Sequence, residues 1–332
     1  MRWLAGALAA MIITSLAGLQ YGRTLLEPVG ADAEPRLFRV ESGASFGAVA
    51  SRLEADGLIR SARAATWLAR AQGFDQKLHV GEYELSGNQP TEEILDTLTA
   101  GRVKTWSVTF PEGSRATEIA MRLESEGLAN AADFMSAVNS AELAAEFGVP
   151  TSRLEGYLYP DTYQLPRGLP AGQIVRLMLK QFDRVWSKEI EEFASTSKLS
   201  RNEVVILASI VEKETASPSE RPLIASVFLN RLARRMRLET DPTVIYGIPD
   251  FDGNLRKKDL NNDKNPYNTY RIPGLPPGPI ANPGLDALRA VVKPDESEYL
   301  YFVSRNDGTH HFSVSYREHT NAVNRYQKRR QR

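Results

Sequence analysis

The segment EVVILASIVEKET, residues 203–215, places the strongest constraint on how this chain of 332 residues can fold. Its spacing predicts a helix that is apolar on almost every side, which is typical of a helix buried inside a domain. Two carboxylates nevertheless stand near its end. At about 100° per residue, Glu214 projects between the rows of Leu207 and Ile210, whereas Glu212 lies nearer the polar seam. Such a conflict between a residue and its surroundings indicates a functional site.

Burial gives Glu214 a chemical role. Desolvation raises the pKa of a carboxyl group because the charged form loses its hydration. A carboxylic acid that keeps its proton near neutral pH can act as a general acid on an ether oxygen. Periodicity therefore predicts Glu214 as a catalytic acid. An equally open alternative is that Glu212 and Glu214 are helix-end residues bonded to Lys213 or Arg221.

The composition is that of an ordinary folded chain, long enough for about two domains. Hydrophobic residues make up 42% and charged residues 25%, and 41 Lys and Arg balance 41 Asp and Glu. Because no net charge is left to hold a polyanion, nucleic acid is not an expected partner. The sequence has no cysteine, which excludes thiol chemistry, disulfides and thiolate zinc sites.

The usual cofactor and nucleophile motifs are missing from the sequence: GxGxxG after a strand, the Walker loop, GxSxG and HExxH. Nucleotide and serine-hydrolase chemistry lose their usual support, and we predict no cofactor. His310, His311 and His319 lie close in sequence, but their spacing is not clearly that of convergent zinc ligands. We therefore predict no metal site.

The N-terminus carries a long uncharged stretch. Residues 3–22 reach roughly the 30 Å of a bilayer core at 1.5 Å per residue, and Arg2 before them places the N-terminus in the cytoplasm. We predict a transmembrane anchor at 1–24, a linker at 25–35 and an exported body. The alternatives are a cleaved signal peptide, with small residues at 15–17, and a buried globular helix.

An internal repeat organises the next part of the chain. Residues 43–58 and 113–128 share seven of sixteen positions at an offset of seventy, and each follows a short β-like segment. A weaker echo at an offset of eighty pairs the YEL sequence at 83–85 with YQL at 163–165. Each copy is typical of a strand, a glycine turn and a helix.

These patterns predict an α+β chain. Two small β/α modules are expected at 36–105 and 106–150, followed by a mostly helical domain with short strands over 151–332. Helices are predicted at 202–215 and 220–236, and a hairpin and a closing helix near the C-terminus.

The segment YNTY at 267–270, followed by GLPPGPIANPG at 274–284, combines aromatic rings with amide and hydroxyl groups. Sugars bind to that mixture, because their CH faces pack on rings and their hydroxyls bond to polar groups. The alternative is a connector stiffened by proline.

Six ordered blocks resemble the YceG-like family of endolytic murein transglycosylases. They are EGYLYPDTY (155–163), LASIVEKET (207–215), SVFLNRL (226–232), MRLETDPTVIYG (236–247), YNTY (267–270) and GLPPGPIANPG (274–284). The resemblance implies a single-pass protein of the bacterial inner membrane with its C-terminal body in the periplasm. It also implies a LysM-like module near the membrane and a lysozyme-like catalytic domain. The LysM-like stretch lacks an obvious aromatic platform for sugar.

The same resemblance implies the reaction. The enzyme would cut the β-1,4 MurNAc-GlcNAc bond within nascent peptidoglycan strands, leave 1,6-anhydro-MurNAc ends and terminate strand elongation. Glu214, followed by Thr215, takes the catalytic position of the Glu-Ser/Thr pair in lysozyme-like lytic transglycosylases. It would protonate the glycosidic oxygen and then take the proton of the C6 hydroxyl, while Glu212 raises its pKa by repulsion. Peptidoglycan strands, the inner membrane and cell-wall synthases are the implied partners.

The residues expected to bind substrate lie in the same blocks: Tyr159, Asp161, Asp241, Thr243, Tyr246, Tyr267, Asn268, Thr269 and Tyr270. Two other functions stay open. A lysozyme-type retaining hydrolase needs a second carboxylate about 5 Å away, for which Glu212, Asp241 and Asp161 are candidates. The other is a membrane-anchored scaffold that binds glycan, against which a buried carboxylate argues.

Overall fold

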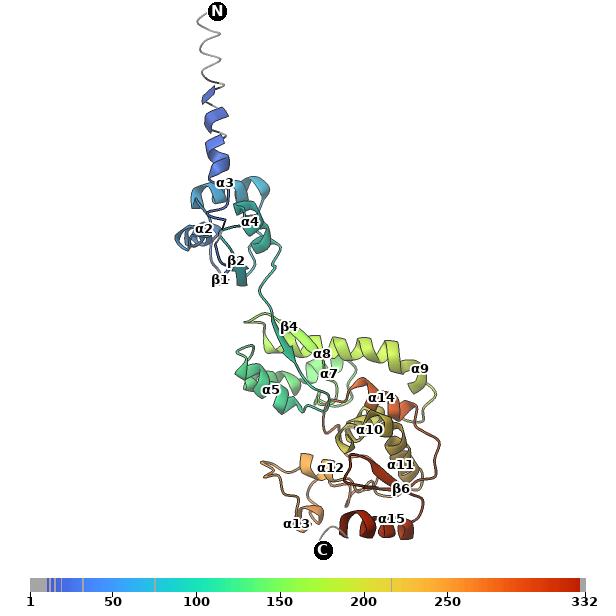
Figure 1. Cartoon of the computed structure of the whole chain (residues 1–332). Helices are drawn as coiled ribbons and strands as arrows, with labels where there is room; N and C mark the ends of the chain where they lie inside the picture. Colours follow the sequence, from blue (N-terminus) through green and yellow to red (C-terminus); the bar gives the residue numbers. More distant parts are fainter. Residues whose placement is uncertain are drawn as a thin grey trace, which may run out of the picture. The chain divides into compact units, whose positions relative to one another are not determined.

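The structure is a computed structural model, and it describes residues 11, 13–14, 16–18, 20–31, 33–74, 76–215 and 217–328. The chain forms two compact units (Figure 1). The first comprises the chain up to Trp106 with Gln164–Gly168, and the second comprises Ser107–Tyr163 and the chain from Leu169 onward. About 48% of the structure is helical and the strands are short, which confirms the predicted mixture of helices and strands. The module boundaries and the LysM-like character of the first module stay predictions.

The predicted membrane anchor at 1–24 falls largely outside the described residues. Within the part of the chain that the structure describes, no helix is both long and apolar enough to cross a bilayer. The predicted single-pass localisation in the inner membrane with a periplasmic body is therefore contradicted.

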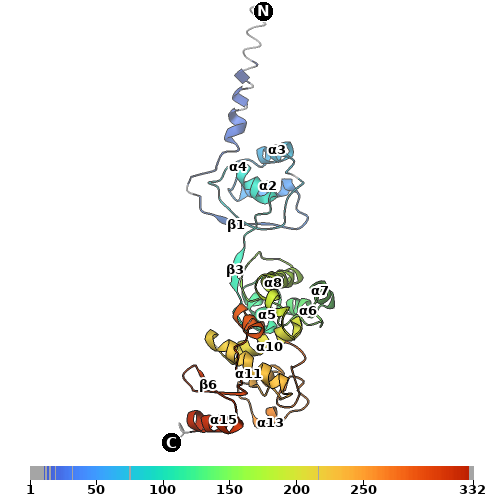
Figure 2. The same ribbon diagram turned by 90° about the vertical axis from the view of Figure 1, so that its right-hand side faces the viewer.

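The first unit is built on an antiparallel pair of strands with helices beside it (Figure 2). Its elements are β1 (Arg36–Val40), α2 (Phe46–Ala55), α3 (Ala62–Gln72), β2 (Gly81–Leu85) and α4 (Thr91–Thr99). In the register of the strands, Phe38 lies opposite Tyr83, and both side chains are buried. Because side chains alternate along a strand, the same face of the sheet packs on the apolar sides of the helices.

The internal repeat is visible in the order and pairing of the elements. β3 (Trp106–Thr109) and α5 (Ala116–Ser125) repeat β1 and α2, while β4 (Thr162–Leu165) and α8 (Ala171–Val185) repeat β2 and α4. β3 pairs with β4 as β1 pairs with β2. The second copy also contains α6 (Ala131–Val138) and α7 (Ala141–Glu146). The predicted strand, turn and helix of each copy is confirmed.

The tyrosines of the weaker echo have the same role in both copies. The Tyr83 hydroxyl donates to the His79 carbonyl at 2.7 Å, and the Tyr163 hydroxyl donates to the Tyr159 carbonyl at 2.7 Å. Each bond joins a strand residue to the residue four positions earlier, so it fixes the entry into β2 and β4 in the same way. The second copy of the repeat therefore runs past residue 150, where the second module was expected to end.

Helix α10 (Arg201–Glu214) is the core helix of the second unit. Its residues Val204 to Val211 are all buried, as the apolar pattern predicts. It packs against α11 (Arg221–Ala233), α12 (Asp241–Tyr246) and α14 (Leu285–Val292). At its start, the Glu203 carboxylate accepts from the Ser200 amide at 2.8 Å while the Ser200 hydroxyl accepts from the Glu203 amide. This capping box fixes where the helix begins and so which residues occupy its last turn.

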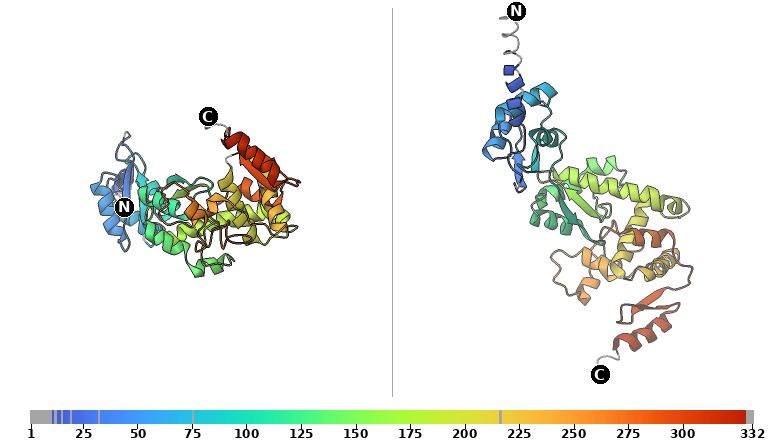
Figure 3. Two further views of the ribbon diagram at one scale, coloured as in Figure 1. Left: turned by 90° about the horizontal axis from the view of Figure 1, so that it is seen from below. Right: turned by 45° about the horizontal axis from the view of Figure 1, so that its top comes forward.

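The remaining elements of the second unit are η1 (Trp186–Ile190), α9 (Glu191–Ala194), η2 (Pro218–Glu220), α13 (Lys257–Leu260), β5 (Tyr301–Ser304), β6 (His310–Ser313), α15 (Tyr316–Val323) and η3 (Asn324–Lys328). β5 and β6 form an antiparallel hairpin in which Ser304 lies opposite His310. Helix α15 lies along this hairpin (Figure 3). The predicted hairpin and closing helix are confirmed.

Candidate active site

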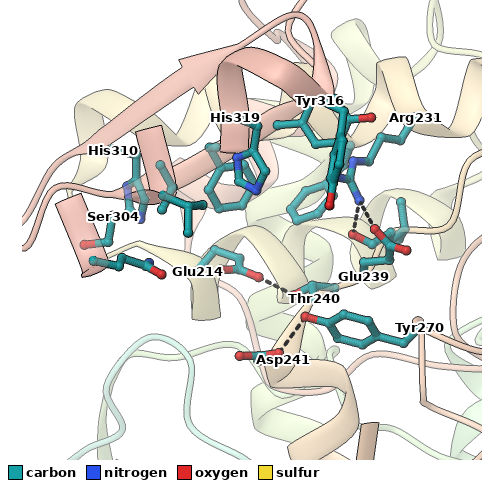
Figure 4. A pocket seen from close by; sticks show the side chains of 17 residues that line it. Glu214, Arg231, Glu239, Thr240, Asp241, Tyr270, Ser304, His310, Tyr316 and His319 are labelled. Atoms are coloured by element: carbon teal, nitrogen blue, oxygen red, sulfur yellow. Dashed lines mark hydrogen bonds and ion pairs between the residues drawn. The ribbon is translucent and has the colours of Figure 1, made fainter. Parts of the chain in front are cut away.

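Glu214 is the last residue of α10 and lines a cavity of about 470 Å³ (Figure 4). The walls come from α11, the segment 238–241, Tyr270, the hairpin strand β5 and α15. Their side chains include the aromatic rings of Phe228, Tyr270, Tyr301, Phe302 and Tyr316 and the polar groups of Arg231, Glu239, Thr240, Asp241, His310 and His319. The cavity thus combines aromatic faces with hydrogen-bonding groups around one carboxyl group.

The carboxyl group of Glu214 keeps its proton more readily than an ordinary glutamate. Burial raises its pKa to about 7, and the negative charge of Asp241 adds to the rise. The Thr240 hydroxyl donates a hydrogen bond to Oε1 and lowers the pKa, as do the charges of His310 and Arg231. The C-terminal end of a helix also disfavours a negative charge. Near neutral pH the group is therefore shared between its acid and its base form.

Thr240 is held rigidly where it meets Glu214. Its amide donates to the Thr269 hydroxyl at 3.1 Å, and its carbonyl accepts from the Thr243 hydroxyl at 2.7 Å. Thr243 and Thr269 are fully buried, and their hydroxyls bond to each other at 2.8 Å. These two predicted substrate-binding residues thus support Thr240 from behind the cavity wall.

Asp241 opens α12 and lines the same cavity as Glu214. The Tyr270 hydroxyl donates to its Oδ1 at 2.8 Å, so the two predicted binding residues are brought together. The negative charge that repels Glu214 is that of Asp241. The sequence-based hypothesis gave this role to Glu212.

Glu212 is engaged elsewhere. It accepts from the Arg221 guanidinium at 2.6 Å and from the Gly284 amide at 2.9 Å, and its side chain is 5% exposed. Burial raises its pKa, while the Gly284 amide and Arg221 oppose the rise. The helix-end alternative, in which a glutamate is bonded to Arg221, therefore describes Glu212, whereas Glu214 bonds to Thr240.

A second cavity, of about 430 Å³, adjoins Glu214 on the side of Glu212. It is lined by Glu112, Glu212, Lys213, Glu214, Thr215 and Arg221. Glu214 belongs to the lining of both this cavity and the first one. We call the two spaces the aromatic cavity and the Arg221 cavity.

His310 lines the aromatic cavity and is fixed by Glu220, a residue that the sequence reasoning missed. The Glu220 carboxylate accepts from the His310 amide at 2.9 Å and lies 2.7 Å from its Nδ1. A carboxylate at Nδ1 holds a proton on that nitrogen and fixes the orientation of the ring. Ninety positions separate the pair, and no local pattern links them. In the part of the chain that the structure describes, no three His, Asp or Glu side chains gather as metal ligands would.

Arg231 is a further cavity residue that was not predicted. Its buried guanidinium donates to the Leu300 carbonyl at 2.7 Å and the Leu238 carbonyl at 2.9 Å, and it pairs with Glu239 at 3.3 Å. It therefore ties the hairpin to the segment that carries Thr240.

Three predicted binding residues lie away from the aromatic cavity in structural positions. Asn268 is fully buried and donates to the carbonyls of the α13 turn, including that of Asn262 at 2.8 Å. The Tyr159 carbonyl accepts from Tyr163. Asp161 accepts from its neighbour Thr162 and from Gln181 in the turn before β4.

The last two predicted binding residues, Tyr246 and Tyr267, line a third cavity, of about 340 Å³. Their rings meet edge to face at 4.7 Å between centroids. Glu155, at the start of the EGYLYPDTY block, lies in this cavity and is 5% exposed. The structure thus divides the predicted aromatic residues between two places.

The chain matches known proteins over most of its length. The model of a family described as the YceG-like family matches residues 38–325. A protein of Bacillus subtilis (strain 168) named endolytic murein transglycosylase is 32% identical over an alignment of 326 positions that covers 92% of this chain and 89% of the relative. A protein of the same name from Streptococcus pneumoniae serotype 2 is 29% identical over 86% of this chain and 57% of its own length.

A solved structure agrees with this match. The crystal structure of a putative YceG-like protein from Listeria monocytogenes has a TM-score of 0.60 and 31% identity, covering 88% of this chain and 100% of that one. A carboxyl group that keeps its proton near neutral pH is suited to act as a general acid. The chain belongs to the YceG-like family, which confirms the resemblance seen in the sequence.

Proposed function

We propose that this chain is an endolytic murein transglycosylase, a lyase that cuts the β-1,4 MurNAc-GlcNAc bond within peptidoglycan strands. Relatives of that name support the reaction class. One observation carries the assignment of the catalytic residue. Glu214 has a pKa raised to about 7, and it lines a cavity whose aromatic rings and polar groups suit a sugar. Nascent strands as substrate and termination of their elongation belong to the same proposal.

The proposed mechanism uses one carboxyl group twice. Protonated Glu214 gives its proton to the glycosidic oxygen, and the C1–O bond breaks with the electron pair leaving on that oxygen. The Glu214 carboxylate then takes the proton of the C6 hydroxyl of the same muramic residue, whose oxygen bonds to C1. The product is a 1,6-anhydro ring and Glu214 regains its proton. A group with a pKa near the working pH is suited to both steps because neither form is costly to reach.

The two cavities that meet at Glu214 support cleavage inside a strand. An acid that cuts internally needs room for sugars on both sides of the bond. The aromatic cavity offers rings for sugar faces, the Arg221 cavity offers charged and hydroxyl groups, and Glu214 belongs to both linings. We infer that the glycan strand runs through both spaces.

A retaining hydrolase is the second candidate, and one observation favours it. Of the three carboxylates proposed as its nucleophile, Asp241 lines the same cavity as Glu214. Asp161 lies in the turn before β4, and Glu212 is bound to Arg221. A hydrolase would produce reducing ends, and replacement of Asp241 by Asn would abolish its activity.

The test is mass spectrometry of purified peptidoglycan glycans after incubation with the full chain, its Glu214→Gln variant and its Asp241→Asn variant. We expect internal fragments ending in 1,6-anhydro-muramic acid from the wild type and from Asp241→Asn, and none from Glu214→Gln. Glu296→Gln, at an exposed loop position, is the matched control and should cleave normally. Reducing ends that vanish with Asp241→Asn would establish the hydrolase. A lack of cleavage by any protein would favour a glycan-binding scaffold.

The domain division belongs to the same proposal. We propose that residues 36–105 form a LysM-like module and 106–150 a second small module, and that 151–332 form the lysozyme-like catalytic domain. The pair β1–β2 with its helices supports the first module, and the helices around α10 support the catalytic domain. Cell-wall synthases are proposed as partners. Glycan affinity of the 36–105 module is testable by replacing its exposed Trp67 with Ala in the full chain.

A further inference from the structure

The cavity that contains Glu155 is separate from the two cavities at Glu214, and the proposed reaction does not use it. Besides Tyr246 and Tyr267, its wall contains Arg115, Arg153 and Glu155. These residues are far apart in the sequence: Arg115, Arg153 and Glu155 come before the EGYLYPDTY block ends, whereas Tyr246 ends α12 and Tyr267 follows α13. The fold gathers them in the second unit.

Glu155 forms the floor of this cavity. One carboxylate oxygen accepts from the Ala116 amide at 2.9 Å and from the Asn282 side-chain amide at 2.9 Å. The other oxygen accepts from the Tyr246 hydroxyl at 3.2 Å. Burial raises its pKa to about 7 against the effect of these donors and of nearby Arg153 and Arg115. The carboxyl group is therefore held in place and is partly neutral near pH 7.

The guanidinium groups of Arg115 and Arg153 can bind an anion in addition to Glu155. Neither Arg115 nor Arg153 forms an ion pair with any residue that the structure describes. Arg115 lies over the Tyr246 ring, 5.2 Å from its centroid. Arg153 lies near the Tyr267 hydroxyl and opposes the rise that burial gives to its pKa. Two cations therefore face one carboxyl group, which leaves a positive balance at the mouth of the cavity.

The remaining residues of the cavity wall indicate which kind of anion would fit. Met135, Val138, Ile248, Pro249 and Pro266 provide an apolar lining beside the charged groups. Guanidinium groups bind carboxylates through paired hydrogen bonds, and an apolar lining favours a ligand with small aliphatic groups next to its carboxylate. A neutral sugar would offer the two guanidinium groups no partner of opposite charge.

We propose that this third cavity is a binding site for an acidic peptide, with carboxylates held by Arg115 and Arg153 and small apolar side chains against the Val138 and Ile248 wall. The stem peptide of a murein strand combines carboxylates with small apolar side chains. Its assignment as the natural ligand rests on the proposed function. Helix α12 connects the site to the aromatic cavity, since Asp241 at its start lines one and Tyr246 at its end lines the other. At 1.5 Å per residue these positions are about 8 Å apart along the helix.

The experiment measures peptide binding without cleavage. The full chain carrying Glu214→Gln is titrated calorimetrically with N-acetyl-Ala-Glu-Ala and with the corresponding Ala-Gln-Ala amide, which has no carboxylate. We expect the acidic peptide to bind at least roughly tenfold more tightly than the amide. Arg115→Gln and Arg153→Gln should each reduce its affinity roughly tenfold or more, and Arg153→Lys should restore part of it by keeping the charge.

Arg122→Gln is the matched control, because Arg122 lies exposed on α5 and pairs only at 3.5 Å with Glu126. It should leave peptide affinity unchanged. Thermal unfolding of each variant shows that it is folded. Equal binding of acid and amide, or affinity that is insensitive to Arg115 and Arg153, would overturn the site, and so would preferential binding of a neutral chitin oligosaccharide there.

This outcome is independent of the cleavage assay. Peptide binding without glycan cleavage would remove the proposed function and leave the carboxylate site in place. Cleavage without peptide binding would do the reverse.

Discussion

Replacement of Thr240 by Val tests whether the Glu214 proton controls the reaction. Valine keeps the shape of threonine but removes the hydroxyl that donates to Oε1 of Glu214. A hydrogen bond to a charged group contributes about 1.5–3 kcal/mol, and part of it survives when the carboxyl is protonated. A remaining difference of about 1.4 kcal/mol corresponds to about one pKa unit. Because the lost bond favoured the carboxylate, the pKa of Glu214 should rise from its value of about 7.

Asp241→Asn should shift the same pKa in the opposite direction. A neighbouring like charge in a near-aqueous medium repels by on the order of 0.7 kcal/mol, which is about half a pKa unit. The aqueous value applies because Asp241 is exposed. Removal of this repulsion stabilises the Glu214 carboxylate and lowers its pKa.

The assay is the initial rate of glycan cleavage between about pH 5 and pH 9, where the alkaline limb reports loss of the general acid. Thr240→Val should move that limb up by about one unit and Asp241→Asn should move it down by about half a unit. Thermal unfolding controls for changes of fold. Movement of both limbs in one direction, or of neither, would refute the assignment of the limb to Glu214.

Three further predictions concern stability. The pKa of Glu155 is about 7 in the folded chain and 4.5 for a free carboxyl, so the unfolded state releases its proton first and the free energy of unfolding falls as pH rises through that window. Glu155→Gln should remove on the order of 2–3 kcal/mol of this fall, measured by urea unfolding at both ends of the window; an unchanged pH profile would contradict it. Asn282→Ala leaves the buried amides of Gly156 and Leu158 without their acceptor and should cost about 3–5 kcal/mol in the same assay, whereas a loss below about 1 kcal/mol would show that the network is dispensable. Arg221→Leu strands the buried Glu212 carboxylate and should cost about 3–5 kcal/mol; the double variant with Glu212→Leu should recover most of it, and equal losses would count against the pair.

The part of the site that could be predicted lies within one helix. Helical periodicity determines which residues of 203–215 face inward. The spacing of the apolar residues was therefore enough to identify Glu214 as the buried carboxyl group. The same count separated it from Glu212, and the structure gives the two carboxylates different partners, Thr240 and Arg221.

The partners themselves could not be predicted. Thr240 is 26 positions from Glu214, and Glu220 is 90 positions from His310. No local period relates such residues, because their meeting depends on how the hairpin and the 238–241 segment pack on α10. Composition pointed to sugar binding at YNTY, yet only its two tyrosines line cavities, while Asn268 and Thr269 bond to buried backbone and hydroxyl groups.

The extent of the internal repeat could also be predicted only in part. Identity between residues 43–58 and 113–128 revealed the strand, turn and helix of both copies. The weaker echo between 83–85 and 163–165 related β2 to β4, but α7 and the EGYLYPDTY block intervene, so the echo alone did not show that β4 and α8 complete the second copy. Matching hydrogen bonds of Tyr83 and Tyr163 provide that link.

The hydrogen bonds of Asn282 determine which part of the chain can fold first during its synthesis. They join residues that are 124, 126, 127 and 168 positions apart. The core of the first unit, by contrast, lies entirely between Phe38 and Val103. Because the N-terminal end leaves the ribosome first and domains fold as units, this core can form while the second unit still waits for residue 282. The wall around Glu214 is completed later still, by Tyr301 and Tyr316. A chain that stops before the hairpin therefore contains every residue of the N-terminal core but lacks part of the wall around Glu214.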